Sequence, residues 1–285
     1  MFEVMLLDLG GNLRGKWVTP DKMGDVMDGQ MKLPVTTLAL DAWGRDVDAL
    51  VFDKGDGDGW LVPDPRTLAP VPWIPRPGGQ VLVSMHEVDG EPCGYDPRGI
   101  IQNLIERLAG HGYTAVMATE MEFNLVRDHR DAMGRPIHSQ EDSVGGSVGA
   151  GQTYGIESMQ EVAELMHDVR DACDAQGLPI DTLTKEAAPS QYEINLYHTD
   201  DALVAADQAV MLQRLIRGVA RNHELLATFM AKPFGDIAGN GMHVHCSLLD
   251  AQGKNAFDDG TGAGTPLLRQ AIAGCLETMS DSMLL

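Results

Sequence analysis

Gly241-Met242-His243-Val244-His245-Cys246 places two histidines at alternate positions of a short apolar stretch. Because side chains alternate between the two faces of a β-strand, His243 and His245 are expected to share one face, with the apolar residues between them covered on the other. The same spacing occurs in Thr119-Glu120-Met121-Glu122-Phe123, whose two glutamates would also share a face. Both stretches therefore predict strands that carry metal-ligand side chains on one side only.

A third stretch, Lys185-Glu186-Ala187-Ala188-Pro189-Ser190-Gln191-Tyr192-Glu193, places two more glutamates on either side of a proline turn, so that both can point into one space. Four carboxylates and two imidazoles on neighbouring strands would be costly to bury without cations. Oxygen ligands with at most one imidazole per ion suit Mg²⁺ or Mn²⁺ better than zinc. Each motif alone is weak, but together they predict a site for two cations, as phosphoryl transfer requires.

Composition limits the class of protein. The chain has 285 residues, of which 44% are hydrophobic and 22% charged, as is typical of a globular protein with one large or two modest domains. Its formal net charge of −21 disfavours nucleic acid and anionic membranes as partners. The N-terminus lacks the positive charge of a signal peptide, no 18 apolar residues run together, and the four cysteines show no metal-ligand spacing. We expect a cytoplasmic protein with reduced thiols and no membrane segment.

The hydrophobic pattern changes at a turn-rich segment, residues 88–92. Residues 1–92 contain short apolar runs separated by glycines and prolines, which predict a small β-rich domain. Its expected strands are Val4–Leu9, Ala49–Phe52 and Gln80–Met85. Residues 93–285 mix helices and strands without a regular βαβ order, so the predicted fold class is α+β.

Periodicity and end signals define the elements of the second part. The expected helices begin at Asp96-Pro97, span Glu157–Gln176 and Asp201–Leu226, and begin again at Thr265-Pro266. The expected strands are Tyr113–Val126, Asp181–Glu186, Gln191–Tyr197 and Met242–Leu249.

Three stretches resemble the signature motifs of the glutamine synthetase family in order and spacing: E-M-E-F (120–123), K-E-A-A-P-S-Q-Y-E-I (185–194) and K-P-F-G-D-I-A-G-N-G-M-H-V-H-C-S-L (232–248). Asp8–Lys16 and Val62–Thr67 are similar to that family's D-x-N-G-x-x-R-G-K and x-P-D-P-x-T. The glutamates and histidines alone would also suit a metal hydrolase, which the ordered motifs disfavour. The resemblance runs from about residue 4 to the last residue.

The resemblance implies a β-grasp-like N-terminal domain followed by a catalytic domain of antiparallel strands and helices. It also implies homo-oligomeric rings with active sites between subunits. The implied reaction uses ATP to phosphorylate the γ-carboxylate of glutamate, after which an amine displaces phosphate.

Position by position, the resemblance implies a site for two or more Mg²⁺ or Mn²⁺ ions. Glu122, Glu186 and Glu193 would hold the first ion, near glutamate and the amine. Glu120 and His243 would hold the second ion, near the phosphates of ATP.

The remaining implied roles concern substrates. His245 and Ser247 match positions that contact ATP, and His245 also lies beside the transferred phosphate. Gly239 matches a glycine that receives glutamate through its backbone, and Tyr154 matches an aromatic residue at the glutamate and amine end. Tyr197 and His198 fall near the contacts to the nucleotide base. The catalytic residues would be Glu186, His245 and Tyr154.

Departures from the family pattern favour an amine larger than ammonia. Leu33–Thr37 replaces the family's F-D-G-S-S, whose aspartate binds ammonium, and Ala238 replaces an asparagine. Leu40–Arg45, Gly55–Gly59 and Ser247–Asn255 look most like the γ-glutamylpolyamine synthetase branch, and an acidic protein attracts cationic amines. We therefore expect a polyamine or another primary amine as acceptor; glutamine synthetase using ammonia is the alternative.

The chain ends at Leu285, where the family continues with an arginine-rich stretch and a last metal-ligand glutamate. We expect an intact first cation site, an incomplete second one, and apolar surface exposed where further strands would pack. An alternative of another class is a truncated, non-catalytic subunit that binds metal or nucleotide, or joins a ring of complete subunits.

Two further sequence patterns resemble known binding loops but predict no binding site. Gly145–Gly151 lacks the G-K-[S/T] of a phosphate-binding loop and is interpreted as an active-site flap or a flexible loop. Asp53, Asp56 and Asp58 lack the spacing of a calcium loop and predict a turn.

Overall fold

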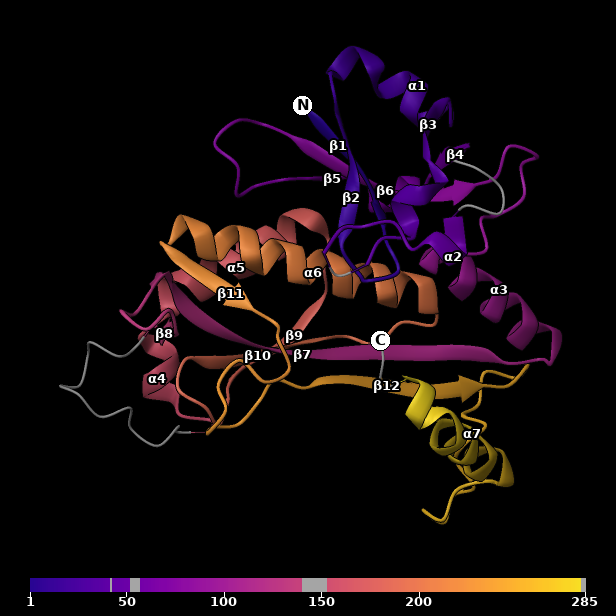
Figure 1. The fold of residues 1–285 in the computed structure, drawn as a ribbon. Helices are drawn as coiled ribbons and strands as arrows, with labels where there is room; N and C mark the ends of the chain where they lie inside the picture. The colour runs from indigo at the N-terminus through magenta and orange to yellow at the C-terminus, as the bar shows by residue number, and fades with distance from the viewer. Residues whose placement is uncertain (42, 52–56, 140–152, 283–285) are drawn as a thin grey trace.

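The structure, a computed structural model, describes residues 1–41, 43–51, 57–139 and 153–282. Figure 1 shows an N-terminal sheet lying above a layer of helices α5 and α6, with a second sheet built around the long strand β7 beneath them. Helix α7 (Pro266–Ser282) lies on the far side of that second sheet. The mixture of separate sheets and helices confirms the α+β class.

The N-terminal sheet has the order β2-β1-β6-β4-β3, with β5 also paired to β6. Only the β1–β6 pair is parallel among these strands, and the other pairs are antiparallel. Val4, Leu6, Val81 and Val83 form its buried core. The strands are β1 (Phe2–Leu7), β2 (Leu13–Val18), β3 (Met31–Pro34), β4 (Asp58–Pro63), β5 (Ala69–Pro70) and β6 (Gly79–His86). The short helices are η1 (Pro20–Lys22), α1 (Met23–Met27), η2 (Val35–Leu38), α2 (Asp48–Val51) and η3 (Pro65–Thr67).

One expected strand of this part is wrong. Asp48–Val51 forms the short helix α2 where Ala49–Phe52 was expected to be a strand, and Phe52 lies outside the described residues. A run of four residues is too short for its periodicity to distinguish a strand from one helical turn. Of the three residues expected to form a turn, Asp53 and Asp56 lie outside the described residues and Asp58 begins β4.

The second sheet is antiparallel and is organised by β7 (Thr114–Arg130). One edge of β7 pairs first with β12 and then with β11, and the other edge pairs with β10 and β8. The remaining strands are β8 (Pro136–His138), β9 (Ile180–Lys185), β10 (Gln191–Leu196), β11 (Leu225–Thr228) and β12 (Met242–Leu249). The four strands expected from alternation are therefore confirmed.

Helices cover one face of this sheet. Phe123, Leu125 and Ile194 of the strands pack with Leu212 and Leu215 of α6 in one hydrophobic cluster. Met5 and Leu82 of the N-terminal sheet belong to the same cluster, so that sheet packs directly on the helix layer. The helices are α3 (Pro97–Gly110), α4 (Ile156–Gln160), α5 (Ala163–Gln176) and α6 (Ala202–Asn222). The division at residues 92 and 93 stays a prediction.

Two expected helices have different bounds. The helix expected over Glu157–Gln176 is interrupted at Val162, whose φ of −117° is not helical, and β-branched residues have a low helix propensity. The apolar pattern continues across this turn, because Met159 and Val162 pack on the same cluster as α5. The helix expected to reach Leu226 ends at Asn222, where the positive φ of Glu224 turns the chain into β11, a strand that the sequence did not predict.

The face of β12 that carries Met242, Val244 and Cys246 differs from expectation. Met242 is 57% exposed and Val244 51% exposed, and Cys246 is exposed as well. These side chains were expected to be covered, but β12 lies beyond the reach of α5 and α6, and α7 buries none of its own residues. Ile272, Leu276 and Met279 of α7 are exposed too, which confirms the expected apolar surface.

Cys93, Cys173, Cys246 and Cys275 are free thiols. Among the described helices, none combines the length and the hydropathy needed to cross a bilayer.

A buried arginine joins the two parts of the chain. Arg98 of α3 is 3% exposed and donates to Asp207 of α6 at 2.8 Å, to Asp64 at 2.7 Å and to Ser84 of β6 at 2.8 Å. Asp64 lies in the Val62–Thr67 motif and also accepts from Arg66, the first cause of a pKa lowered to about 2. The motif therefore serves an ion cluster between the N-terminal sheet and the helix layer.

Candidate functional site

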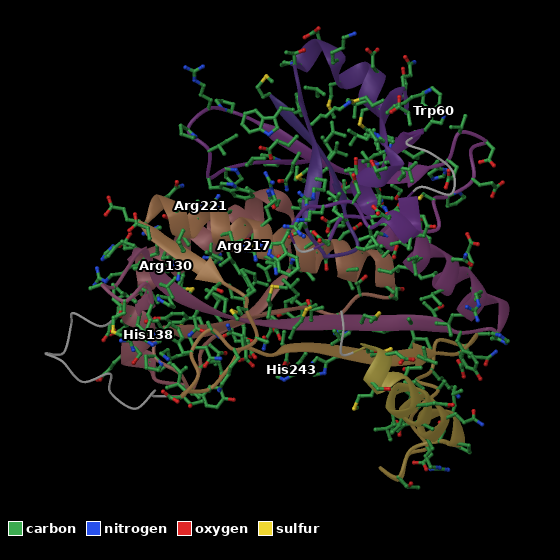
Figure 2. The ribbon with its side chains drawn as sticks, in the orientation of Figure 1. Trp60, Arg130, His138, Arg217, Arg221 and His243 are labelled. Carbon is green, nitrogen blue, oxygen red and sulfur yellow. The ribbon has the colours of Figure 1, made fainter. Side chains whose placement is uncertain are left out.

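The glutamates and histidines singled out from the sequence lie on adjacent strands of the second sheet. Glu122 on β7 is opposite Glu193 on β10, and Glu120 is opposite His243 on β12 at the other edge of β7. Figure 2 shows His243 on the side of the sheet away from α6. The alternation expected for β7 is confirmed, because Met121, between the two glutamates, and Phe123, directly after them, are buried in the core beneath the helices.

Glu120 is the centre of the cluster. Its Oε2 lies 2.9 Å from His243 Nδ1, and its Oε1 lies 2.9 Å from His245 Nε2. Burial alone would raise the pKa of Glu120, but the hydrogen bonds to the two imidazoles outweigh it and hold the pKa below its ordinary value. The two histidines therefore share a face, as expected, and both reach the same carboxylate.

The cluster can accommodate a cation. Glu120, Glu193 and His243 each offer a ligand atom, and these atoms all lie within 4.8 Å of one another. Two carboxylates and one imidazole are a ligand set that suits Mg²⁺ or Mn²⁺. This group takes one residue from the first expected ion site, Glu193, and two from the second, so Glu193 lies close to both expected ligands of the second ion.

Two carboxylates of the site, Glu186 and Glu193, have raised pKa values. Burial, followed by the charge of Glu122, raises the pKa of Glu186. Burial also raises the pKa of Glu193, and the charges of Glu120, Glu186 and Glu122 add to this effect. A concentration of negative charge that raises carboxylate pKa values is expected where cations bind, so the residues fit the metals that the resemblance implies.

Gln191 positions the Glu122 carboxylate, a role that was not predicted from the sequence. It is buried, and its Nε2 donates to Glu122 Oε2 at 2.7 Å and to the Gly239 carbonyl at 2.9 Å. Its Oε1 accepts from the Ala188 amide at 2.8 Å. Gln191 thus fixes the Glu122 carboxylate and ties the Gly239 loop to β10. The signal was present, since Gln191 and Glu193 are two residues apart on one strand.

Lys185 supports the turn that carries Glu186. Its side chain is buried, and its Nζ donates to the carbonyls of Ala188 at 2.6 Å and Glu186 at 2.7 Å. Burial lowers the pKa of Lys185 to about 8. No sequence pattern indicates this role, because a lysine beside a glutamate is usually a solvated pair.

A groove of about 970 Å³ extends from Glu120 between β12 and the end of β10. It brings together the residues that the resemblance assigns to ATP, and Asp181 lies in the same groove. A hydrogen bond to Asp181 raises the pKa of Tyr197. The assigned residues that line the groove are His245, Ser247, Tyr197 and His198.

Two assigned residues lie outside this groove, near the Glu186 turn. The Tyr154 amide donates to the Lys185 carbonyl at 2.8 Å, and the Tyr154 side chain is exposed. Gly239 contacts the cluster through its carbonyl on Gln191. The glycine-rich stretch 145–151 lies outside the described residues.

Gly241 is packed against the candidate metal ligands. A Cβ at this position would lie 3.0 Å from Glu122 Oε1 and 3.3 Å from His243 Nε2. Replacing Gly241 by alanine should displace both side chains and weaken Mn²⁺ binding by about 10–100-fold, the range found for altered supporting groups of metal sites. Calorimetric titration with Mn²⁺ measures the change. Gly235→Ala is the matched control, because its Cβ would meet nothing within 4 Å; equal affinities of the two variants would contradict the prediction.

Comparison with known proteins identifies the family. Residues 94–285 match the family model described as glutamine synthetase, catalytic domain. The chain belongs to the glutamine synthetase family.

The individual relatives are longer than this chain. It is 35% identical over 285 residues to gamma-glutamylputrescine synthetase PuuA of Escherichia coli (strain K12), covering 99% of this chain and 60% of that protein. It is 32% identical over 285 residues to gamma-glutamylethanolamide synthetase GlnA4 of Streptomyces coelicolor (strain ATCC BAA-471 / A3(2) / M145), covering 98% of this chain and 60% of that protein. The chain therefore spans about three fifths of the length of these relatives.

A solved structure shares the fold. The structure titled GmaS/ADP complex-Conformation 1 superposes with a TM-score of 0.77 at 27% identity, covering 93% of this chain and 57% of that chain.

Proposed function

We propose that this chain forms part of an ATP-dependent ligase that joins the γ-carboxylate of glutamate to an amine through a γ-glutamyl phosphate intermediate. The observation that carries the proposal is the convergence of Glu120, Glu193 and His243 at the end of a groove lined by His245 and Tyr197. A polyamine or another primary amine is the favoured acceptor. The relatives named for putrescine and ethanolamide support that preference, and ammonia is the alternative acceptor.

The residues divide between two cation sites. Glu122, Glu186 and Glu193 would hold one Mg²⁺ or Mn²⁺ ion, and Glu120 and His243 would hold a second. The bound ions would neutralise charge on the phosphates of ATP and on the carboxylate that is phosphorylated.

The substrates would be held by the residues around these sites. His245 and Ser247 would bind the phosphates of ATP, and Tyr197 would contact the base. Gly239 would receive glutamate, and Tyr154 would lie at the amine end. Glu186 would also act as a catalytic residue beside the incoming amine.

We also propose that complete sites form between subunits of a homo-oligomeric ring in the cytoplasm. Leu33–Thr37, which replaces the family's ammonium-binding stretch, lies in β3 and η2 of the N-terminal sheet. In Figure 1 the helix layer separates β3 from the strand β12 that carries His243. Within one chain this segment is therefore far from the glutamates, so a neighbouring subunit would have to supply it.

A second candidate function is a non-catalytic subunit that binds metal or nucleotide, or joins a ring of complete subunits. The exposed apolar side chains Met242 and Val244 of β12 and Leu276 of α7 favour it, because such a surface needs a covering partner.

Phosphate release from MgATP and glutamate separates the two functions. We expect release to depend on the amine, with putrescine or ethanolamine more effective than ammonium, and little release without amine. Assays of the 285-residue chain and of a version extended to the length of its relatives decide between the candidates. Amine-dependent release by either one supports the ligase, whereas silence in both, with intact Mn²⁺ binding, supports the non-catalytic subunit.

A further inference from the structure

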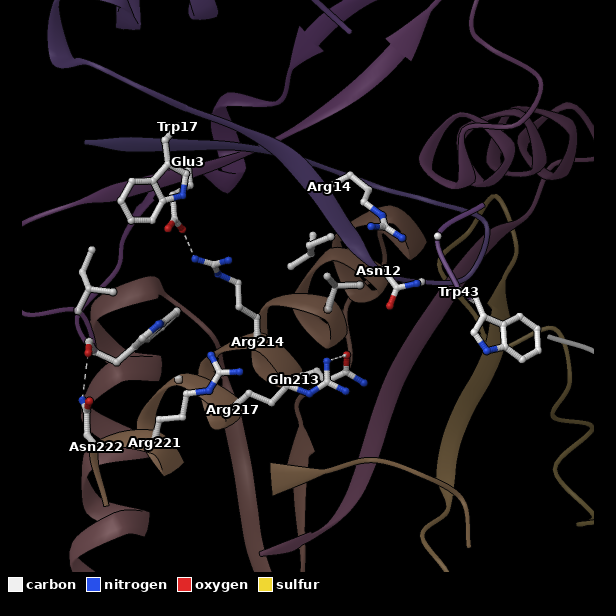
Figure 3. Close-up of a pocket in the computed structure, with 17 residues that line it drawn as sticks. Glu3, Asn12, Arg14, Trp17, Trp43, Gln213, Arg214, Arg217, Arg221 and Asn222 are labelled. Carbon is white, nitrogen blue, oxygen red and sulfur yellow. Dashed lines mark hydrogen bonds and ion pairs between the residues drawn. The ribbon is translucent and has the colours of Figure 1, made fainter. Parts of the chain in front are cut away.

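Two grooves that share no lining residue with the Glu120 groove flank the C-terminal half of α6. The first, about 830 Å³, lies between the N-terminal strands and α6, and Figure 3 shows Arg214 pointing from α6 toward Glu3 there. The second, about 720 Å³, lies beside β11. Gln213, Arg217 and Arg221 line both grooves, because residues four apart share one face of a helix.

The second groove is strongly positive. Arg130 of β7 joins Arg217 and Arg221 in its lining, and no acidic residue is among the described residues that line it. Figure 2 shows these three arginines on the α6 side of the second sheet, away from His243. The chain has 42 acidic against 21 basic residues, so a purely basic groove is unexpected on composition alone.

Two of the three guanidinium groups, those of Arg130 and Arg217, donate to neutral acceptors. Arg217 donates to Gln213 Oε1 at 3.2 Å, and Arg130 donates to the Gly134 carbonyl at 3.1 Å. Arg214, one turn earlier, is by contrast paired with Glu3. Burial, followed by the charge of Arg221, lowers the pKa of Arg217. Like charges four residues apart on a helix repel, so the pair would gain from a bound anion.

The rest of the lining is mainly apolar. The Arg217 guanidinium lies 5.1 Å from the centre of the Phe229 ring, so the charged end of the groove adjoins an aromatic surface. A ligand that fills the groove would therefore combine a charged group with an apolar body. The apolar residues are Val126, Pro136, Leu226, Ala227, Phe229, Met230 and Pro233.

We propose that this groove binds a small organic anion, a carboxylate or phosphate on an apolar body. Its charged group would lie between Arg130, Arg217 and Arg221, and its body would pack on Phe229. The site is separate from the proposed ligase site, so a ligand bound here would act on the chain without occupying the place of ATP, glutamate or amine.

Calorimetric titration with defined probes tests the proposal. Phenyl phosphate and phenylacetate are compared with inorganic phosphate and with benzyl alcohol, at low salt and with EDTA present, so that phosphate cannot bind through cations at the glutamates. We expect one saturable site for at least one aromatic anion, weaker binding of inorganic phosphate, and none of benzyl alcohol. The stronger aromatic anion identifies the preferred charged group. Added salt should weaken binding.

Variants locate the site. Arg130→Gln, at a position that lines the second groove and not the first, and Arg217→Gln should each weaken binding by about tenfold or more, as expected for loss of a charge-assisted hydrogen bond. Arg107→Gln, which changes an exposed arginine of α3 outside both grooves, should leave it unchanged. No saturable binding, or equal binding by Arg217→Gln, overturns the proposal. Self-association that Arg217→Gln abolishes, without binding of any probe, would instead assign the groove to a second copy of the chain and also overturns it.

Discussion

Arg98→Met is expected to destabilise the chain by about 3–5 kcal/mol, the usual effect of removing one partner from a buried ion pair. Arg98 supplies both hydrogen bonds to the Asp207 carboxylate that join α3 to α6. Burial already raises the pKa of Asp207, and Arg98 opposes this rise. Without Arg98 the Asp207 carboxylate would be buried with no cation in contact, whereas Asp64 would keep Arg66. Urea unfolding at neutral pH measures the loss.

The pH dependence of this loss distinguishes it from a simple packing defect. A carboxylate whose folded-state pKa lies above its unfolded value destabilises the fold once it ionises, and it ceases to do so as the pH falls. The deficit of Arg98→Met should therefore shrink between pH 7 and pH 5. Arg98→Lys should lose less stability, and Arg107→Met, at an exposed site, little. A deficit that does not change with pH would assign the role of Arg98 to packing.

Glu193→Gln is expected to weaken Mn²⁺ binding by at least about 100-fold, since even the loss of a supporting group costs roughly 10–100-fold. The same substitution should stabilise the metal-free chain at neutral pH. The pKa of Glu193 is raised by burial and by Glu120, Glu186 and Glu122, so its ionised form opposes folding without a cation. Thermal unfolding with and without Mn²⁺ measures both effects, and their opposite signs are the specific signature of a cation site.

The matched control is Glu106→Gln, which removes the same charge from an exposed position on α3. It should change neither Mn²⁺ affinity nor the stability of the metal-free chain. If Glu193→Gln binds Mn²⁺ as tightly as the original chain, Glu193 is not a ligand and the two-ion assignment is wrong.

The site could be predicted from the sequence because it depends on strand alternation. The site residues come in pairs two positions apart: Glu120 with Glu122, and His243 with His245. Side chains two apart on a strand share a face wherever the strand begins or ends. The order of the three motifs then identified the family, which the match over residues 94–285 confirms.

What could not be predicted depends on contacts between distant segments. Leu225 and Leu226 fit a helix and a strand equally well, and only pairing with β7 makes them β11. The exposed face of β12 follows from how far the helices extend, which no local pattern encodes. The basic groove likewise brings Arg130 of β7 next to Arg217 of α6. These residues are far apart in the sequence, and no local pattern indicates that they meet.

The two halves of the candidate metal cluster stand on strands of unequal local stability. Strand β7 is paired along both edges. Strand β12 is paired only with β7 among the described strands, and its side chains Met242 and Val244 are exposed to water. Backbone amides of β12 should therefore exchange with deuterium sooner than those of β7, through local opening. A cation that joins His243 to Glu120 would connect the two strands through their side chains. Its binding should slow exchange in β12 far more than in β7, so the site would hold its own edge strand in place.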